Sequence, residues 1–85
     1  MIHAIALELK KLRISKGISQ ENLSFSSGLN RNYIGIIEKG ETNISMAVFF
    51  NICKGLNENP ATILEKFDLQ YMEQNYSLEA KSPKS

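Results

Sequence analysis

Four consecutive residues in the first half of the chain, Asn30-Arg31-Asn32-Tyr33, carry side chains able to hydrogen-bond to the edges of nucleic-acid bases. An arginine guanidinium pairs with O6 and N7 of guanine, and an asparagine amide pairs with N6 and N7 of adenine. Such a polar run has no purpose on a helix face that packs into a core. It suits a helix that enters a DNA groove, and the alternative is that these side chains are merely exposed.

A tight turn, Ser26-Ser27-Gly28-Leu29, sets this run at the start of a helix. A turn of that length makes two short helices cross steeply, as in a helix-turn-helix. In that motif the second helix lies in the major groove, while the first helix crosses the phosphate backbone. The residues predicted to face solvent on the second helix are Arg31, Asn32 and Gly35, with Ile36 at the edge, whereas Ile34 and Ile37 face inward.

Three successive helix starts share one local pattern, a capping residue preceded by an apolar residue and followed by another at the fourth helical position. The three sets are Ile18-Ser19 with Leu23, Leu29-Asn30 with Ile34, and Ile44-Ser45 with Phe49. A coincidence of three is improbable, so Ser19, Asn30 and Ser45 are predicted to begin helices.

Helical periodicity dominates the chain, and no alternating stretch is bounded by a hairpin turn, so the fold class is all-α. The prediction is a compact five-helix bundle with helices over about 3–16, 19–26, 30–38, 45–55 and 59–67. The first four helices end at Gly17, the Ser27-Gly28 turn, Gly40 and Gly55. Residues 1–67 are expected to form the domain and residues 68–85 a short C-terminal extension. Leu69, Met72 and Tyr76 could form another helical turn or two, and the terminal residues are expected to be disordered.

Composition limits the possible functions. The 85 residues suffice for one domain, with 42% hydrophobic and 22% charged residues. No apolar run could cross a membrane, no secretion signal is evident, and the single cysteine excludes an internal disulfide, so a reducing, cytoplasmic location is expected. The net charge is only +1, but residues 1–40 carry six basic against three acidic residues, and residues 41–85 four against six. This asymmetry weakly favours an anionic partner at the N-terminal half, with chance as the alternative.

Nothing in the sequence suggests catalysis: no paired acid and base, nucleophile with its base, metal constellation or phosphate-binding glycine loop can be recognised. Cys53 has the spacing of a core residue, and His3 stands alone near a terminus. Neither an enzymatic activity, a metal nor a cofactor is therefore expected.

The run LRISKGISQENLSFSSGLNRNYIGIIEKG, residues 12–40, resembles the phage-repressor and Cro class of helix-turn-helix proteins, the XRE family. The resemblance extends over about residues 5–67 and implies a lambda-repressor-like DNA-binding domain. Within the class, the sequence of residues 30–38 is similar to that of the small controller proteins of restriction–modification systems. Stand-alone phage and plasmid repressors share much of that sequence pattern.

The resemblance implies a role for individual residues. Arg31 and Asn32 match base-reading positions, and Asn30 opens the same helix. Gln20 matches a residue that touches a phosphate and braces the recognition helix, with a solvated residue as the alternative; Ser19 either donates to phosphate or only caps its helix. Tyr33 could touch a thymine methyl group or a phosphate, or pack at the helix edge. The further candidates for DNA backbone contacts are Lys39, Thr42, Asn43 and Ser45.

Two positions depart from the family pattern. Gly35 and Ile36 replace polar side chains with which many members read further bases, so apolar contact and DNA shape are expected to contribute more. Glu41 stands where relatives often carry a basic or neutral residue, and it either points away from DNA or pairs with Lys39.

Two further groups are assigned structural roles. Arg13 and Glu38 match a family ion pair that orients the recognition helix. Because so small a domain has little interior, Leu56, Ile63, Leu64 and Phe67 are predicted to pack against a second copy. The alternative is that Ile63 and Phe67 close the core of one protomer while residues 69–76 cover Leu64.

The leading hypothesis is a homodimeric, sequence-specific transcription regulator that binds a double-stranded DNA operator at a promoter, with RNA polymerase as a further candidate partner. Such a protein would be cytoplasmic and associated with the nucleoid through its operator. The alternative is a phage- or plasmid-type repressor or an antitoxin whose main partner is another protein.

Overall fold

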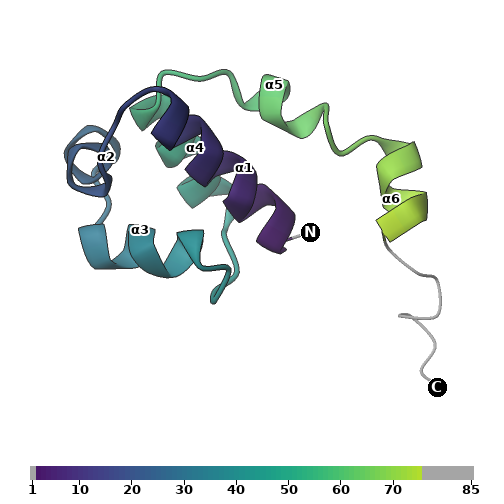
Figure 1. The fold of residues 1–85 in the computed structure, drawn as a ribbon, viewed down its shortest axis with the longest axis horizontal. Helices are drawn as coiled ribbons and strands as arrows, with labels where there is room; N and C mark the ends of the chain where they lie inside the picture. The colour runs from purple at the N-terminus through teal and green to yellow at the C-terminus, as the bar shows by residue number, and fades with distance from the viewer. Residues whose placement is uncertain (1, 76–85) are drawn as a thin grey trace.

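The computed structural model describes the backbone of residues 2–75 and the side chains of residues 4–75, so Tyr76 and the expected terminal tail lie outside the described residues. The described part contains helices and no strands, which confirms the all-α prediction. The helices are α1 (Ile2–Ser15), α2 (Gln20–Ser27), α3 (Arg31–Glu38), α4 (Met46–Gly55), α5 (Pro60–Leu64) and α6 (Leu69–Asn75) (Figure 1).

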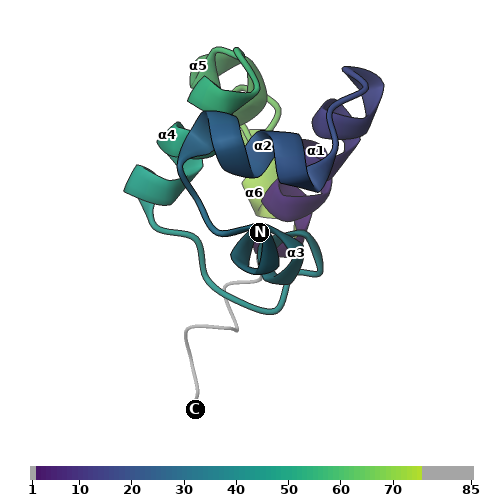
Figure 2. The same cartoon turned by 90° about the vertical axis from the view of Figure 1, so that its left-hand side faces the viewer.

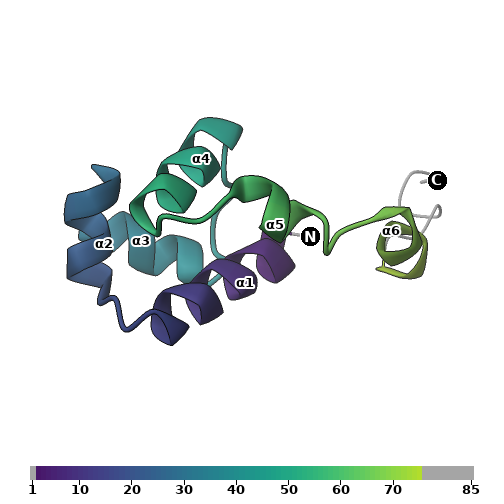
Figure 3. The ribbon, with the colours of Figure 1, turned by 90° about the horizontal axis from the view of Figure 1, so that it is seen from above.

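One hydrophobic core joins the first five helices. Its buried members are Leu9, Leu23, Ile34, Ile37, Phe49, Ile52, Cys53, Leu56 and Ile63. Helix α2 packs most extensively on α4, and α3 packs on both α1 and α2. Seen from above, α5 lies between α4 and the start of α1 (Figure 3). This arrangement leaves one long side of α3 uncovered along the edge of the molecule (Figure 1).

The three predicted capping residues do begin helices. Ser19 Oγ accepts a hydrogen bond from the Asn22 N–H at 3.0 Å, and Ser45 Oγ accepts one from the Val48 N–H at 3.1 Å. Asn30 caps α3 in the same way. The apolar residues that precede the caps, Ile18, Leu29 and Ile44, pack against the core. Local capping chemistry therefore fixes where the middle three helices start.

The α2–α3 unit has the steep crossing of a helix-turn-helix. Helix α2 is seen end-on in Figure 1, where α3 runs across the view, and the reverse holds in Figure 2. The turn depends on Gly28, whose φ of 75° lies in the left-handed region. The N–H of Gly28 donates to the Ser24 carbonyl at 3.0 Å, which closes the end of α2.

Gly55 is the last residue of α4, as predicted, but it does not supply the left-handed end of that helix. Asn57, with a φ of 56°, takes this conformation. Gly55 is instead needed for close packing, because a Cβ there would lie 2.9 Å from both Leu23 Cδ1 and Ser26 Oγ of α2. Ser26 Oγ also donates to the Gly55 carbonyl at 3.0 Å. The small residue thus lets α2 and α4 touch.

The described part of the chain has six helices instead of the predicted five, because the further turns left open at Leu69 and Met72 form α6. Helix α5 ends at Leu64, whereas the prediction ran it to about Phe67. A new helix then begins because Asp68 Oδ1 accepts a hydrogen bond from the Tyr71 N–H at 2.8 Å. Helix α6 has no buried residue and lies apart from the other helices, at the opposite end of the molecule from α2 (Figures 1 and 3).

Candidate nucleic-acid interface

The outer face of α3 presents the residues that the sequence predicted to be there. Ile34 and Ile37 are buried in the core, whereas Arg31, Asn32, Ile36 and Lys39 are exposed. Residues three and four apart share a helix face, so Arg31 stands beside Gly35 and Asn32 beside Ile36. The face combines a guanidinium, an amide and an ammonium group around one glycine and one isoleucine.

The cap of α3 also orders its first turn. Asn30 Oδ1 accepts hydrogen bonds from the N–H groups of Asn32 at 2.8 Å and Tyr33 at 3.4 Å. The cap uses only the carbonyl oxygen of this side chain, and its NH2 group can still donate. Tyr33 is half-buried and packs against the core, which corresponds to the packing alternative for this residue.

A buried network ties the end of α3 to α1 and α2. Arg13 Nε and Nη2 donate to the two carboxylate oxygens of Glu38 at 2.6 and 3.0 Å, and the two side chains are 11% and 5% exposed. Arg13 Nη1 donates to the Ile18 carbonyl at 2.7 Å. Gln20 Nε2 adds a third bond to Glu38, at 2.9 Å to Oε1. Gln20 therefore braces α3, and its amide donor is directed inward.

A hollow of about 400 Å³ lies on this face, between α3, the start of α2 and α1. Its lining residues are Lys10, Gln20, Arg31, Asn32, Gly35, Ile36, Glu38 and Lys39. Glu38 is neutralised by Arg13, so three cationic side chains dominate the charge of the hollow. An anionic ligand is favoured there.

Lys10 is the member of this group that the sequence predictions missed. It precedes Arg13 by three residues, and positions three apart share a helix face. Because Arg13 was already expected to reach the end of α3, this spacing could have placed Lys10 beside the recognition helix.

The loop before α4 holds the remaining candidates. Thr42 is half-buried, and its hydroxyl donates to the Asn43 carbonyl at 3.5 Å, the outer limit of a hydrogen bond. Asn43 and Glu41 are exposed. Within residues 4–75 neither Glu41 nor Lys39 takes part in an ion pair, so the expected alternative of a Lys39–Glu41 pair is not formed.

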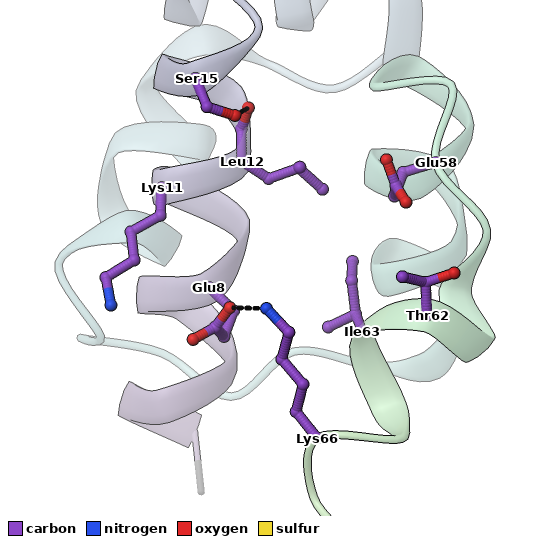
Figure 4. Close-up of a pocket in the computed structure, with 8 residues that line it drawn as sticks. All are labelled: Glu8, Lys11, Leu12, Ser15, Glu58, Thr62, Ile63 and Lys66. Carbon is purple, nitrogen blue, oxygen red and sulfur yellow. Dashed lines mark hydrogen bonds and ion pairs between the residues drawn. The ribbon is translucent and has the colours of Figure 1, made fainter.

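A second cavity, of about 320 Å³, lies between α1 and α5 (Figure 4). Leu12 and Ile63 point into it, and Glu8 pairs with Lys66 across it at 2.8 Å. Glu58, on the opposite side, pairs with Lys16 at 3.4 Å, and the Ser15 hydroxyl donates to the Leu12 carbonyl at 2.9 Å. Both carboxylates of the lining, Glu8 and Glu58, are therefore paired with lysines.

In the described part of the chain, no three histidine, cysteine, aspartate or glutamate residues are grouped as metal ligands would be. Cys53 is buried, and burial, followed by the negative charge of Glu58, raises the pKa of its thiol to about 11. None of the helices described is long and apolar enough to span a membrane.

The four residues predicted to contact a second copy divide into two groups. Leu56 and Ile63 are 1% and 4% exposed within a single protomer, so their prediction as interface residues was wrong: the end of α4 and the inner face of α5 direct them into the core. Leu64 is 36% exposed. Phe67 is half-buried and packs against the core, which corresponds to the alternative for this residue, and it meets Tyr71 edge-on, with ring centroids 4.9 Å apart. Only Leu64 and Phe67 remain candidates.

The sequence pattern of the helix-turn-helix family matches residues 9–63, which include α2 and α3 and most of the core. The chain belongs to this family.

Within the family it is similar to restriction–modification controller proteins. It is 32% identical to control protein C.SmaI of Serratia marcescens over 66 residues, 78% of this chain and 79% of the relative. The crystal structure of controller protein C.AhdI from Aeromonas hydrophila superposes with a TM-score of 0.69 at 35% identity, covering 73% of this chain and 94% of C.AhdI. The C.Esp1396I tetramer in complex with its natural 35 base-pair operator gives 0.73 at 32% identity, covering 76% and 86%.

Proposed function

We propose that this chain is a sequence-specific, homodimeric transcription regulator that binds operator DNA at a promoter, and that it serves as the controller of a restriction–modification system. The observation that carries the proposal is the hollow beside the outer face of α3, where the base-reading candidates Arg31 and Asn32 are joined by two further cations, Lys10 of α1 and Lys39. The similar protein C.Esp1396I is bound to its operator, which supports the same function here. The proposed activity is DNA binding, without a catalytic step. The proposed location of the protein is the cytoplasm, at the nucleoid.

Arg31 and Asn32 are the proposed base readers, because they are exposed at the first turn of the recognition helix, where a helix-turn-helix meets base edges. Lys10 and Lys39, which line the same hollow, are the proposed phosphate contacts. The hydroxyl groups of Ser19 and Ser45 accept at their caps and retain a proton to donate to phosphate. The remaining proposed backbone contacts are Asn30, Thr42 and Asn43, whereas Gln20 acts as the brace of α3 because its amide donor is bonded to Glu38.

RNA polymerase is the proposed protein partner, since a regulator bound at a promoter acts by blocking the polymerase or by recruiting it. Transcription with purified polymerase, with and without the protein, tests this step. An operator complex that changes neither polymerase occupancy nor transcript yield would contradict it.

Selection of bound duplexes from random DNA, followed by affinity measurements on variants, tests the DNA interface. Arg31→Ala is expected to weaken cognate binding by about 1–3 kcal/mol and to relax the preference at one base pair in each half-site, because a bidentate base contact is lost. Uniform weakening on all sequences would assign Arg31 to phosphate instead.

Lys10→Ala and Lys39→Ala are the variants to compare with Arg31→Ala, because they remove proposed phosphate contacts instead of a base contact. Each should weaken specific and non-specific binding alike and reduce the salt slope by about one unit for each half-site. If the salt dependence of binding is unchanged in one of these variants, that lysine does not contact phosphate. If no duplex is selected, while a protein partner is bound at high salt, the alternative of a repressor or antitoxin directed at a protein replaces this proposal.

A further inference from the structure

The outer face of α3 includes one apolar side chain that the fold does not use. Ile36 is 40% exposed, whereas Ile34 and Ile37 are each 1% exposed in the core. Ile36 shares its helix face with Asn32, four residues earlier, and lies about 6 Å further along the helix axis. A proposed base reader thus has an apolar neighbour one turn away on the surface offered to DNA.

The residue before Ile36 is Gly35, which has no side chain. An ideal Cβ at Gly35 would find only one atom nearby, Gln20 Oε1 at 3.9 Å, so the position is open. Gln20 does not fill the space, because its Nε2 is held by Glu38 at 2.9 Å. The φ of Gly35 is not positive, and a glycine inside a helix is destabilising. Its backbone conformation does not require glycine, whereas close approach of another molecule would.

The chemistry of the major groove identifies what such a surface fits. Thymine alone among the four bases presents an apolar group there, its C5-methyl group. We propose that Gly35 lets the backbone of α3 approach the base edges, and that the Ile36 side chain then packs on the C5-methyl group of a thymine in each half-site. The inference rests on the proposed DNA-binding function and adds a defined base feature that the polar residues of α3 do not read.

The test replaces single thymines of the selected operator by uracil, which removes only the methyl group. For the parent protein we expect affinity to fall about three- to tenfold per half-site at one position, as removal of one buried methyl group implies. The Ile36→Ala variant should bind the thymine operator more weakly and show less than a twofold difference between thymine and uracil at that position. Ile36 is half-exposed, so this variant should fold, and its thermal unfolding checks that it does.

Asn32→Ala is the matched control, because it changes the neighbouring contact on the same face. It should bind more weakly but keep the full difference between thymine and uracil. The methyl contact is overturned if the parent protein binds a specific operator yet tolerates uracil at every position, or if Ile36→Ala is as sensitive to uracil as the parent. Absence of specific binding to any duplex would overturn the DNA interface itself and this inference with it.

Discussion

Glu38 organises the candidate site from a side chain that is only 5% exposed. Its carboxylate accepts hydrogen bonds from Arg13 and Gln20, so one buried charge links the three helices that shape the DNA-binding face. Replacing it by a neutral side chain leaves the guanidinium of Arg13 buried without its counter-charge.

Glu38→Gln is therefore expected to lower the free energy of unfolding by about 3–5 kcal/mol. Urea denaturation measures the loss. Glu8→Gln is the matched control, because it breaks the Glu8–Lys66 pair, whose side chains are 25% and 57% exposed, and should lower it by less than about 1 kcal/mol. Similar losses in the two variants would mean that the buried network does not organise the fold.

Cys53 shows how burial suppresses reactivity at a single residue. Its pKa rises from 9.0 to about 11, first by burial and then through Glu58, so at neutral pH the folded protein holds an inert thiol. Between those two pH values the unfolded chain loses a proton that the folded chain retains. This contribution to stability is complete below pH 9 and declines as the pH rises towards 11.

The free energy of unfolding should consequently fall more steeply between pH 9 and 11 for the parent than for Cys53→Val, which cannot ionise. Denaturation at several pH values compares the two proteins. Parallel curves would show that the thiol titrates alike in the folded and unfolded chains.

At the scale of helices, much of the fold could be predicted because the signals are local. Ser19, Asn30 and Ser45 begin helices through hydrogen bonds within a few residues of themselves. The packing role of Gly55 could not be predicted, because it depends on α2, about thirty residues away in sequence. The burial of Leu56 and Ile63 within one protomer could not be predicted for the same reason. Apolar spacing identifies the apolar face of a helix, but it does not show whether the core or a second copy covers that face.

Gly55 and Gly35 are both helical glycines, and they should respond oppositely to alanine. At Gly55 the new Cβ would meet α2 at 2.9 Å, so Gly55→Ala is expected to destabilise the protein by about 1–3 kcal/mol. At Gly35 the nearest atom is 3.9 Å away, so Gly35→Ala should stabilise the fold by about 0.5–1 kcal/mol. Thermal unfolding compares the variants. A gain at both positions would mean that α2 and α4 can separate without loss.

The site was less predictable than the fold, because it depends on how the whole molecule packs. The face of α3 follows from its own periodicity, whereas the hollow also needs Lys10 of α1 and Gln20 of α2, which only the tertiary packing brings there. The surface available for assembly with a second copy depends on the tertiary packing in the same way. Helices α5 and α6 lie on the side of the molecule away from α2 (Figure 1). They carry two exposed leucines, Leu64 at the end of α5 and Leu69, 73% exposed, at the start of α6.

We propose that this end, Leu64 with Phe67 and α6, packs against a two-fold-related copy. A seven-residue helix with no buried residue has little stability of its own, and burial against a second protomer would supply it. The symmetry would present two α3 helices for half-sites about 34 Å apart, one turn of DNA. Such an interface would determine which operators the protein can occupy.

Leu64→Glu places a charge in the proposed interface while leaving the core intact. Sedimentation at micromolar concentration should show a folded monomer, with the dimer dissociation constant raised at least about tenfold, since burial of one leucine stabilises by about 1.5–3 kcal/mol. Operator affinity should fall with it, because two half-sites then bind separate monomers. Phe25→Glu is the matched control: Phe25 is 75% exposed on α2, at the other end of the molecule, and its replacement should leave the dimer unchanged. A Leu64→Glu dimer as tight as the parent would locate the interface elsewhere, and an unfolded variant would assign Leu64 to the core.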